Sequence, residues 1–271
     1  MASKPELLLG QSTPVVNTYS PQLLYPIDRA EARNTLGLSV VLPFVGVDVW
    51  HAYEMSWLDN SGKPVCRVGR FDIPADSANL VESKSFKLYL NSLNSKKFTS
   101  DQAAITCIVN DISSVAGTLV TLQLFDVDAP QLSGSALSGV CLDGLDVAID
   151  DAPPSKALLE VSKQRTESKL FSHLLRSLCP VTGQPDWATV WIHYKGRAIE
   201  HRSLLRYIIA YREHQEFHEQ CVERMFQDLL QSSDAEFLNI QAFYTRRGGL
   251  DISPFRSTRE SARPQARLNR Q

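Results

Sequence analysis

One order of secondary structure occurs twice along this chain. In the first half, residues 45–58 and 64–73 are rich in β-branched and aromatic side chains and flank a turn at 60–63, which predicts a β-hairpin. Two helices and a strand are expected after it, so the order is β-β-α-α-β. The second half is expected to repeat this order, although the two halves share little residue-level identity. A duplicated architecture is the strongest organisational signal in the sequence.

The helices of the first half are predicted from apolar spacing and from the residues at their starts. Apolar residues of the first helix recur at helical intervals, namely Phe86, Tyr89, Leu90 and Leu93. Glu82 and Ser83 stand at the start of this helix, where backbone N–H groups are free and polar side chains cap. Ser100 and Asp101 open a second helix that runs to about Ser114, and residues 118–127 are expected to form the next strand.

A stretch of different composition, from residue 129 to about residue 163, separates the two halves. This stretch has many small residues, a weak strand pattern at 142–149 and the pair Pro153-Pro154, which are typical of a boundary. Beyond it, we expect strands at 170–178, 188–194 and 237–244, and helices at 203–211 and 216–230.

We therefore predict an N-terminal arm over residues 1–40, domains over 41–155 and 156–257, and a basic tail over 258–271. The arm is expected to be extended and to pack on another part of the protein, with a short helical turn at 28–36. The tail has several arginines and almost no large apolar residues, so we expect a mobile, solvated end.

Charge and cysteine content exclude several classes of function. A formal net charge of −2 argues against broad electrostatic binding to nucleic acid. The cysteines are widely scattered and form no Cys-x-x-Cys pair, so neither a zinc ribbon nor a disulfide framework is indicated: Cys66, Cys107, Cys141, Cys179 and Cys221. No apolar run approaches membrane-spanning length and no signal pattern is evident, so we expect a cytoplasmic protein without a membrane partner.

The loop between the two strands at 170–178 and 188–194 carries the first candidate chemistry. Cys179 lies in a turn that contains Pro180, Gly183 and Pro185, and Asp186 follows seven positions after the cysteine. The prolines restrict the loop, so the thiol and the carboxylate can be held at a fixed separation. A thiolate is a strong nucleophile, and Asp186 is a candidate acceptor for its proton. Taken alone, such a cysteine is more often a small buried hydrophobe.

Three further segments are candidates, each with a simpler alternative. Residues 82–84 are acidic, polar and basic at a helix start, and Glu82 and Ser83 can act there simply as caps. His218 and Glu219 can face solvent on an amphipathic helix. Residues 246–249 are Arg-Arg-Gly-Gly and can merely end a strand.

Cofactor and metal motifs in the sequence are incomplete. No G-x-G-x-x-G motif follows a strand, so a Rossmann domain is not supported. If a phosphorylated cofactor binds, Lys84 and Arg247 are candidate cations and Gly248 allows close backbone approach. His214 and His218 have metal-ligand spacing on a helix, but no third ligand follows at a matching interval, so no metal is predicted.

Taken together, four separated segments closely resemble the NADPH-dependent 7-cyano-7-deazaguanine reductases, the QueF nitrile reductases of queuosine biosynthesis. They are the Glu-Ser-Lys-Ser-Phe-Lys-Leu-Tyr run at 82–89, the loop at 179–186, His218-Glu219, and Arg-Gly-Gly at 247–249. The resemblance covers most of residues 40–257 and follows the long, two-domain form of the family. Its order of motifs makes it far more specific than any one motif.

The resemblance implies an α+β fold and a residue-by-residue site. Its fold is the tunnelling fold (T-fold), in which β-β-α-α-β-β units associate into barrels with sites at interfaces, whereas the sequence alone predicts one closing strand in each half. Cys179 would attack the nitrile carbon to form a thioimide, and Asp186 would carry the proton to the nitrile nitrogen. The implied substrate-binding residues are Val81, Glu82, Ser83, His218 and Glu219. The implied NADPH-binding residues are Ser83, Lys84, Arg247 and Gly248.

Two alternatives to a nitrile reductase follow from the same residues. A related amidinotransferase-like enzyme forms the same thioimide but resolves it with an amine, and the cationic pattern at Lys84 and Arg247 speaks against it. A non-catalytic purine- or pterin-binding protein on the same fold needs no nucleophile, and Cys179 with Asp186 argues against it. Sites at domain interfaces favour a homodimer or a larger assembly, with the small molecule 7-cyano-7-deazaguanine as the substrate and no nucleic acid as a partner.

Overall fold

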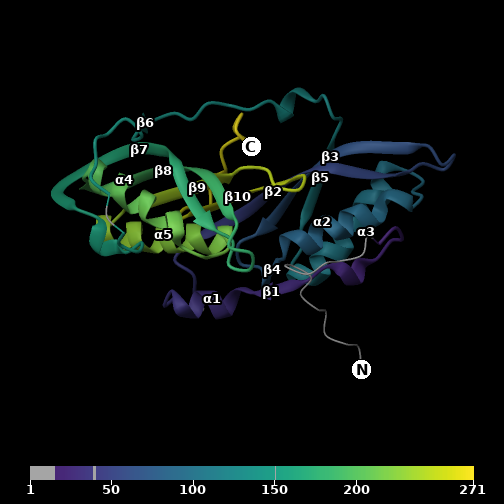
Figure 1. The fold of residues 1–271 in the computed structure, drawn as a ribbon, viewed down its shortest axis with the longest axis horizontal. Helices are drawn as coiled ribbons and strands as arrows, with labels where there is room; N and C mark the ends of the chain where they lie inside the picture. Colours follow the sequence, from purple (N-terminus) through teal and green to yellow (C-terminus); the bar gives the residue numbers. More distant parts are fainter. Residues whose placement is uncertain (1–15, 39–40, 150) are drawn as a thin grey trace. The chain divides into compact units, whose positions relative to one another are not determined.

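The computed structural model describes residues 16–38, 41–149 and 151–271, which form two compact units (Figure 1). The first unit contains the described residues up to Gly37, Asp48–Leu132 and Arg246–Ile252. The second unit contains Leu38–Val47, Ser133–Thr245 and Ser253–Gln271. The units are interleaved along the sequence, because β2 (Val45–Leu58) and β10 (Leu250–Ser257) each contribute residues to both.

In the first unit, the strand order is β5-β3-β2-β10, and a separate pair of short strands lies near the start of α2. Its further elements are β1 (Pro26–Asp28), α1 (Arg29–Thr35), β3 (Pro64–Pro74), β4 (Asn79–Val81), α2 (Ser83–Ser92), α3 (Asp101–Ala116) and β5 (Thr121–Phe125). The predicted hairpin and both predicted helices are confirmed, and the predicted strand at 118–127 is shorter than expected.

The first unit is held by an apolar core on one side of α2. Phe86 is fully buried between the rings of Trp50 and Phe71, with ring centroids 5.3 and 5.0 Å away. Tyr89, Leu90 and Leu93 are buried in the same core, which confirms the helix face expected from their spacing. Of the N-terminal arm, Leu24 is buried in this core and Tyr19 and Leu23 pack against it. The residues of the arm before Val16 lie outside the described residues.

In the second unit, the strand order is β2-β10-β9-β8-β7-β6. Figure 1 shows α4 (His201–Ile209) and α5 (His218–Ser233) along strands β7 to β9. The strands are β6 (Val140–Cys141), β7 (Val161–Leu178), β8 (Pro185–Ile199) and β9 (Phe237–Tyr244). None of the helices in the described residues is long and apolar enough to cross a membrane.

Three expectations for the second unit are corrected. The predicted strand at 142–149 is wrong, because the extended pairing in this region is confined to Val140–Cys141. Strands β7 and β8 are longer than predicted, since their antiparallel pairing extends to Val161 and Ile199. The outer ends of both strands are polar, so the apolar pattern of the sequence did not reveal them. A closing strand was also missed: β10 follows β9 after a tight turn, so this half ends on two strands.

The basic tail is packed, contrary to the expectation of a solvated end. Leu268 is buried against Trp191 and Phe243, and the side chain of Gln271 donates to Ser253 Oγ at 2.7 Å. Gln241 accepts from the backbone N–H of Gln265 at 2.7 Å. Composition misled here because one apolar residue and several backbone hydrogen bonds are enough to dock a short segment.

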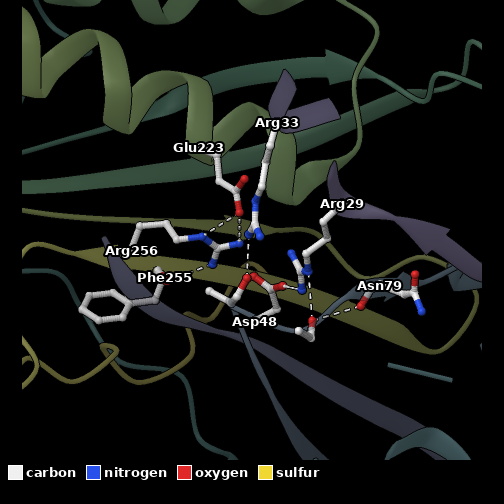
Figure 2. A network of polar contacts seen from close by, with 9 residues as sticks. Arg29, Arg33, Asp48, Asn79, Glu223, Phe255 and Arg256 are labelled. Carbon is white, nitrogen blue, oxygen red and sulfur yellow. Dashed lines mark hydrogen bonds and ion pairs between the residues drawn. The ribbon is translucent and has the colours of Figure 1, made fainter. Parts of the chain in front are cut away.

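Each unit contains a buried arginine–carboxylate pair, and Figure 2 draws both. In the first unit, Arg29 Nη2 lies 2.5 Å from Asp48 Oδ2, and Arg29 Nε donates to Ser77 Oγ at 2.9 Å. In the second unit, Arg256 donates from Nε and Nη2 to Glu223 Oε1 at 3.1 and 2.8 Å. Removing one partner of such a buried pair leaves an uncompensated charge, so these pairs tie α1 to β2 and α5 to β10 within their units.

Candidate active site

The cysteine loop is a tight connection between two long antiparallel strands. Cys179 directly follows β7, and Asp186 is the second residue of β8. The backbone N–H of Cys179 donates to Gln184 O, and the N–H of Gly183 donates to Cys179 O, both at 2.9 Å. Gly183 has a φ of +66°, a left-handed conformation that favours glycine. The loop therefore holds its backbone by internal hydrogen bonds in addition to the prolines.

Asp186 is buried and contacts the helix that follows in the second unit. It pairs in register with Ser177, and the residue is 4% exposed. Its Oδ2 lies 3.2 Å from Nε2 of His218, the first residue of α5. The His218 ring stacks on Tyr244 with centroids 3.8 Å apart. The structure thus brings together two of the predicted site residues and adds Tyr244, which the sequence analysis did not single out.

Glu219 lies beside this cluster, in the first turn of α5. Its side chain is 4% exposed, and the free N–H groups of the helix start favour a carboxylate there. Neither His218 nor Glu219 is therefore an ordinary solvent-facing residue. His214 precedes α5 and contacts Glu216 at 3.0 Å, so His214 and His218 do not share one helix turn.

The cysteines differ in their surroundings. Cys221 is fully buried, and burial, with nearby Glu216, raises the pKa of its thiol well above the ordinary value. Burial likewise raises the pKa of Tyr244, with further contributions from Cys221 and Asp186. A thiol kept protonated in this way is inert, whereas Cys179 is partly exposed in its loop. In the second unit, Cys221 is buried, Cys141 is exposed beside Asp143, and Cys179 is partly exposed in the loop that leads to Asp186.

In the first unit, Glu82 caps α2 and is almost completely buried. Its Oε1 accepts from the N–H of Lys84 at 2.8 Å, and its Oε2 accepts from the N–H of Ser85 at 2.7 Å. Val81 ends β4 and is buried, Ser83 is exposed, and Lys84 is partly exposed. Glu82 therefore acts as a cap, as the simpler alternative held. Capping does not use all of its acceptor capacity, because a carboxylate has about four lone-pair positions and the two capping bonds use two.

The Arg-Gly-Gly segment forms the turn between β9 and β10. The N–H of Arg247 donates to Leu250 O at 2.9 Å, and Gly248 and Gly249 both have positive φ, as a type I′ turn requires. A Cβ on Gly248 would lie 3.0 Å from Lys87 Nζ on α2. The turn thus approaches the same helix that carries Lys84.

Lys87 is a cation that the sequence analysis missed. It lies three residues after Lys84 on α2, and its Nζ is 3.7 Å from Glu54 Oε2. The spacing of Lys84 and Lys87 was the available signal, because residues three apart share a helix face. Cations beside a glycine turn suit the phosphates of a dinucleotide, so the residues of this unit fit NADPH.

Comparison with known proteins is consistent with these features. The family described as "Nitrile reductase, 7-cyano-7-deazaguanine-reductase N-term" matches residues 15–124, and the family described as "QueF-like protein" matches residues 185–263. The two matches define the class of the chain as nitrile reductases of this kind.

Curated relatives span nearly the whole chain. NADPH-dependent 7-cyano-7-deazaguanine reductases from Chromohalobacter salexigens and Dechloromonas aromatica are each 50% identical, covering 92% and 94% of this chain and 91% and 92% of their own. The reductase of the same name from Hydrogenovibrio crunogenus is 47% identical, over 97% of this chain and 96% of its own. The chain belongs to the family of NADPH-dependent 7-cyano-7-deazaguanine reductases, as its motifs predicted.

A more distant solved structure is the apo form of the archaeosine synthase QueF-Like. It is 14% identical, covers 38% of this chain and 99% of its own, and has a TM-score of 0.31. Similarity at this level carries no argument about the fold.

Proposed function

We propose that this enzyme reduces the nitrile of 7-cyano-7-deazaguanine to the aminomethyl group through a covalent thioimide on Cys179. The net reaction consumes two NADPH and two protons, because a nitrile must gain four electrons to become an amine. The observation that carries the proposal is the hairpin in which a partly exposed Cys179 precedes β8 and a buried Asp186 lies 3.2 Å from His218.

The covalent step uses the thiol and one acid. Cys179 Sγ forms a bond to the nitrile carbon, one π bond of the nitrile breaks, and the thiol proton passes through Asp186 to the nitrile nitrogen. His218 holds Asp186 on the side that faces α5, so the acid keeps one orientation while its proton moves. The resulting C=N carbon is a far better hydride acceptor than the nitrile. NADPH, when bound, would supply hydride to this carbon. The C–S bond then breaks, which returns the Cys179 thiolate and leaves a C=N bond, and hydride from a second NADPH with a proton would complete the amine.

Two carboxylates are proposed to bind the heterocycle. Glu82 keeps its capping bonds to Lys84 and Ser85, and its remaining lone pairs can accept the two adjacent N–H groups of a guanine-like edge. Glu219 is a second acceptor, and Val81, Ser83 and His218 complete the contacts to the substrate. Because the capping bonds fix the carboxylate of Glu82 before the substrate arrives, little orientational entropy is lost on binding.

NADPH is proposed to bind through Ser83, Lys84, Arg247 and Gly248, with Lys87 as an added cation. We also propose the T-fold barrel and at least a homodimer, because a β-β-α-α-β-β unit with an exposed sheet edge needs a partner to close it. Native mass in solution tests the assembly; a monomer at working concentration would contradict it.

The nucleophile is tested by intact-protein mass after mixing with 7-cyano-7-deazaguanine in the absence of NADPH. We expect an adduct of one substrate mass that disappears on addition of NADPH. The adduct should be absent in Cys179→Ala and retained in Cys66→Ser, which removes an exposed cysteine elsewhere. An adduct that NADPH leaves unchanged would favour the amidinotransferase-like alternative. Ligand binding without any adduct would favour the purine- or pterin-binding protein.

The cofactor assignment has a separate test. Lys84→Gln should raise the KM for NADPH about tenfold, the loss expected when one charge-assisted hydrogen bond is removed. The same variant should form the thioimide adduct at the wild-type rate, since no cofactor takes part in that step. A loss of adduct formation with unchanged KM would assign Lys84 to the substrate instead.

A further inference from the structure

A cluster of potential metal ligands lies in the second unit, at the edge of the sheet where β6 pairs with β7. Sγ of Cys141, a carboxylate oxygen of Asp143 and a ring nitrogen of His173 all lie within 4.8 Å of one another. None of these residues belongs to the proposed catalytic machinery. We propose that they form a zinc site that fastens the connecting segment around β6 to the sheet.

The donor set favours zinc over the hard cations. Thiolate, imidazole and carboxylate together match the sulfur, nitrogen and oxygen ligands of Zn²⁺, whereas Mg²⁺ and Ca²⁺ prefer oxygen alone. Three protein ligands leave a fourth position for water, which the exposure of Cys141 and His173 permits. Ligand atoms around tetrahedral zinc lie roughly 3.3–3.8 Å apart, so closure requires a shift of about 1 Å, which rotation of the exposed Cys141 side chain can supply.

Two of the three ligands come from a segment that is fixed to β7. Cys141 pairs with Phe171 in a parallel register, and the N–H of Leu142 donates to Phe171 O at 2.9 Å. Leu142 itself is fully buried. The carboxylate of Asp143 accepts from Ser172 Oγ at 2.6 Å and from the N–H of His173 at 3.1 Å. The segment thus presents Cys141 and Asp143 on either side of a buried anchor.

His173 is aimed by an irregularity in the strand and by a neighbour. The pairing of β7 with β8 shifts register between Ser172 and Leu175, and bulges of this kind re-aim side chains. Nδ1 of His173 lies 2.9 Å from Oγ1 of Thr189, which is buried on β8. A hydrogen bond at Nδ1 fixes the ring and leaves Nε2 for the metal, the second-shell arrangement usual for histidine ligands.

A metal here would reinforce the weakest strand of the unit. Strand β6 is two residues long, and its side chains are exposed, so its own pairing gives little resistance to opening. Binding of Zn²⁺ releases the Cys141 proton and links this strand to the middle of β7. We therefore expect the metal to slow opening of the segment rather than to affect the reduction.

The test is a titration of the full-length Cys179→Ala protein, stripped of metal, with Co²⁺ and then Zn²⁺. We expect one equivalent of Co²⁺ with a thiolate charge-transfer band, displaced by one equivalent of Zn²⁺. Cys141→Ser should abolish the band, and His173→Gln should weaken binding by about a hundredfold or more. Thr189→Val should weaken it by about ten- to a hundredfold. Cys66→Ser, the matched exposed cysteine, should bind as the parent does.

Hydrogen exchange gives an independent readout. Zn²⁺ should slow exchange of the backbone amides at 139–143 in the parent protein and leave them unchanged in Cys141→Ser. A band that persists in Cys141→Ser would place the metal elsewhere and overturn the proposal. Wild-type affinity in Thr189→Val would overturn the assignment of Nε2 as the ligand atom, and the absence of binding at micromolar metal would overturn the site itself.

Discussion

Glu82 and Glu200 occupy the same position in the two units, yet they have different surroundings. Each caps the first of two consecutive helices by accepting backbone N–H bonds from residues two and three positions ahead. Ser85 Oγ donates to Glu82 O and Ser203 Oγ donates to Glu200 O, both at 2.7 Å. Glu82 is almost fully buried, whereas Glu200 is exposed.

The correspondence continues along both helices. Ser85 Oγ accepts a backbone N–H from Tyr25, and Ser203 Oγ accepts one from Glu160, both at 3.0 Å. Each helix then carries a tyrosine that donates to an aspartate of the following helix: Tyr89 to Asp111 at 2.6 Å, and Tyr207 to Asp228 at 2.8 Å. The duplication is thus conserved in hydrogen bonds where residue identity is low. Capping needs no burial, so burial is the feature that separates Glu82 from Glu200.

The largest expected effect separates the two glutamates by activity. Glu82→Gln should lower kcat/KM for 7-cyano-7-deazaguanine by about 10²–10³-fold, because one or two hydrogen bonds to a charged acceptor are lost. Glu200→Gln, the matched change at the equivalent helix start, should change kcat/KM by less than about twofold. Steady-state kinetics with saturating NADPH make the measurement.

Circular dichroism and thermal melting of both variants serve as the control for folding. Equal losses of kcat/KM in the two variants would mean that both glutamates act only as caps, and the substrate assignment of Glu82 would then be withdrawn.

A smaller effect separates the two tyrosines by stability. Burial raises the pKa of Asp228, which shows a carboxylate in an unfavourable environment, and Tyr207 is the hydroxyl that donates to it. Asp111 also accepts from Tyr19 at 2.6 Å, so it keeps one donor when Tyr89 is changed. Tyr207→Phe should therefore cost about 1–3 kcal/mol and Tyr89→Phe less, measured by thermal unfolding.

Hydrogen exchange of α5 and α3 should report the same order locally, with the larger increase in α5 of Tyr207→Phe. If Tyr89→Phe were the more damaging change, the second donor to Asp111 would contribute nothing to stability.

The part of this fold that could be predicted from sequence is the part with periodic apolar patterning. Phe86, Tyr89 and Leu90 predicted α2 because their spacing records which face is buried. The polar outer end of β7 has no apolar pattern, because its backbone pairs with β8 while many of its side chains face solvent. The prediction of a solvated tail was wrong for a related reason. A single leucine docks the tail, and the average composition of a segment does not reveal one such residue.

For the candidate site as well, the sequence indicated residues that form motifs and did not indicate residues that act through contacts between elements. Cys179, Asp186, Glu82 and Glu219 could be proposed from the sequence because their types and order form a recognisable set of motifs. Tyr244 and Lys87 were not singled out because their contacts run between separate elements, namely the stack on His218 and the approach to Gly248. Sequence spacing alone does not give such contacts.

The smallest expected effect tests how Glu200 caps α4. Burial alone would raise the pKa of Glu200. Hydrogen bonds from the N–H groups of Arg202 and Ser203 outweigh burial and lower the pKa of Glu200 below its ordinary value. A lowered folded-state pKa favours the ionised form, so its stabilisation is present above the unfolded pKa and is lost as pH falls through the folded value. Glu200→Gln should therefore lower Tm near pH 7 by an amount corresponding to about 1 kcal/mol or less, with no difference near pH 3.

Ser203→Ala is the matched control, because its hydroxyl does not titrate. Its loss of the 2.7 Å bond to Glu200 O should lower Tm by a similar amount at both pH values. If the Tm difference of Glu200→Gln also persisted near pH 3, the cap would act through a neutral hydrogen bond and not through its charge. In that case the negative charge of Glu200 would contribute nothing to its cap. Only the activity measurements would then separate Glu82 from Glu200.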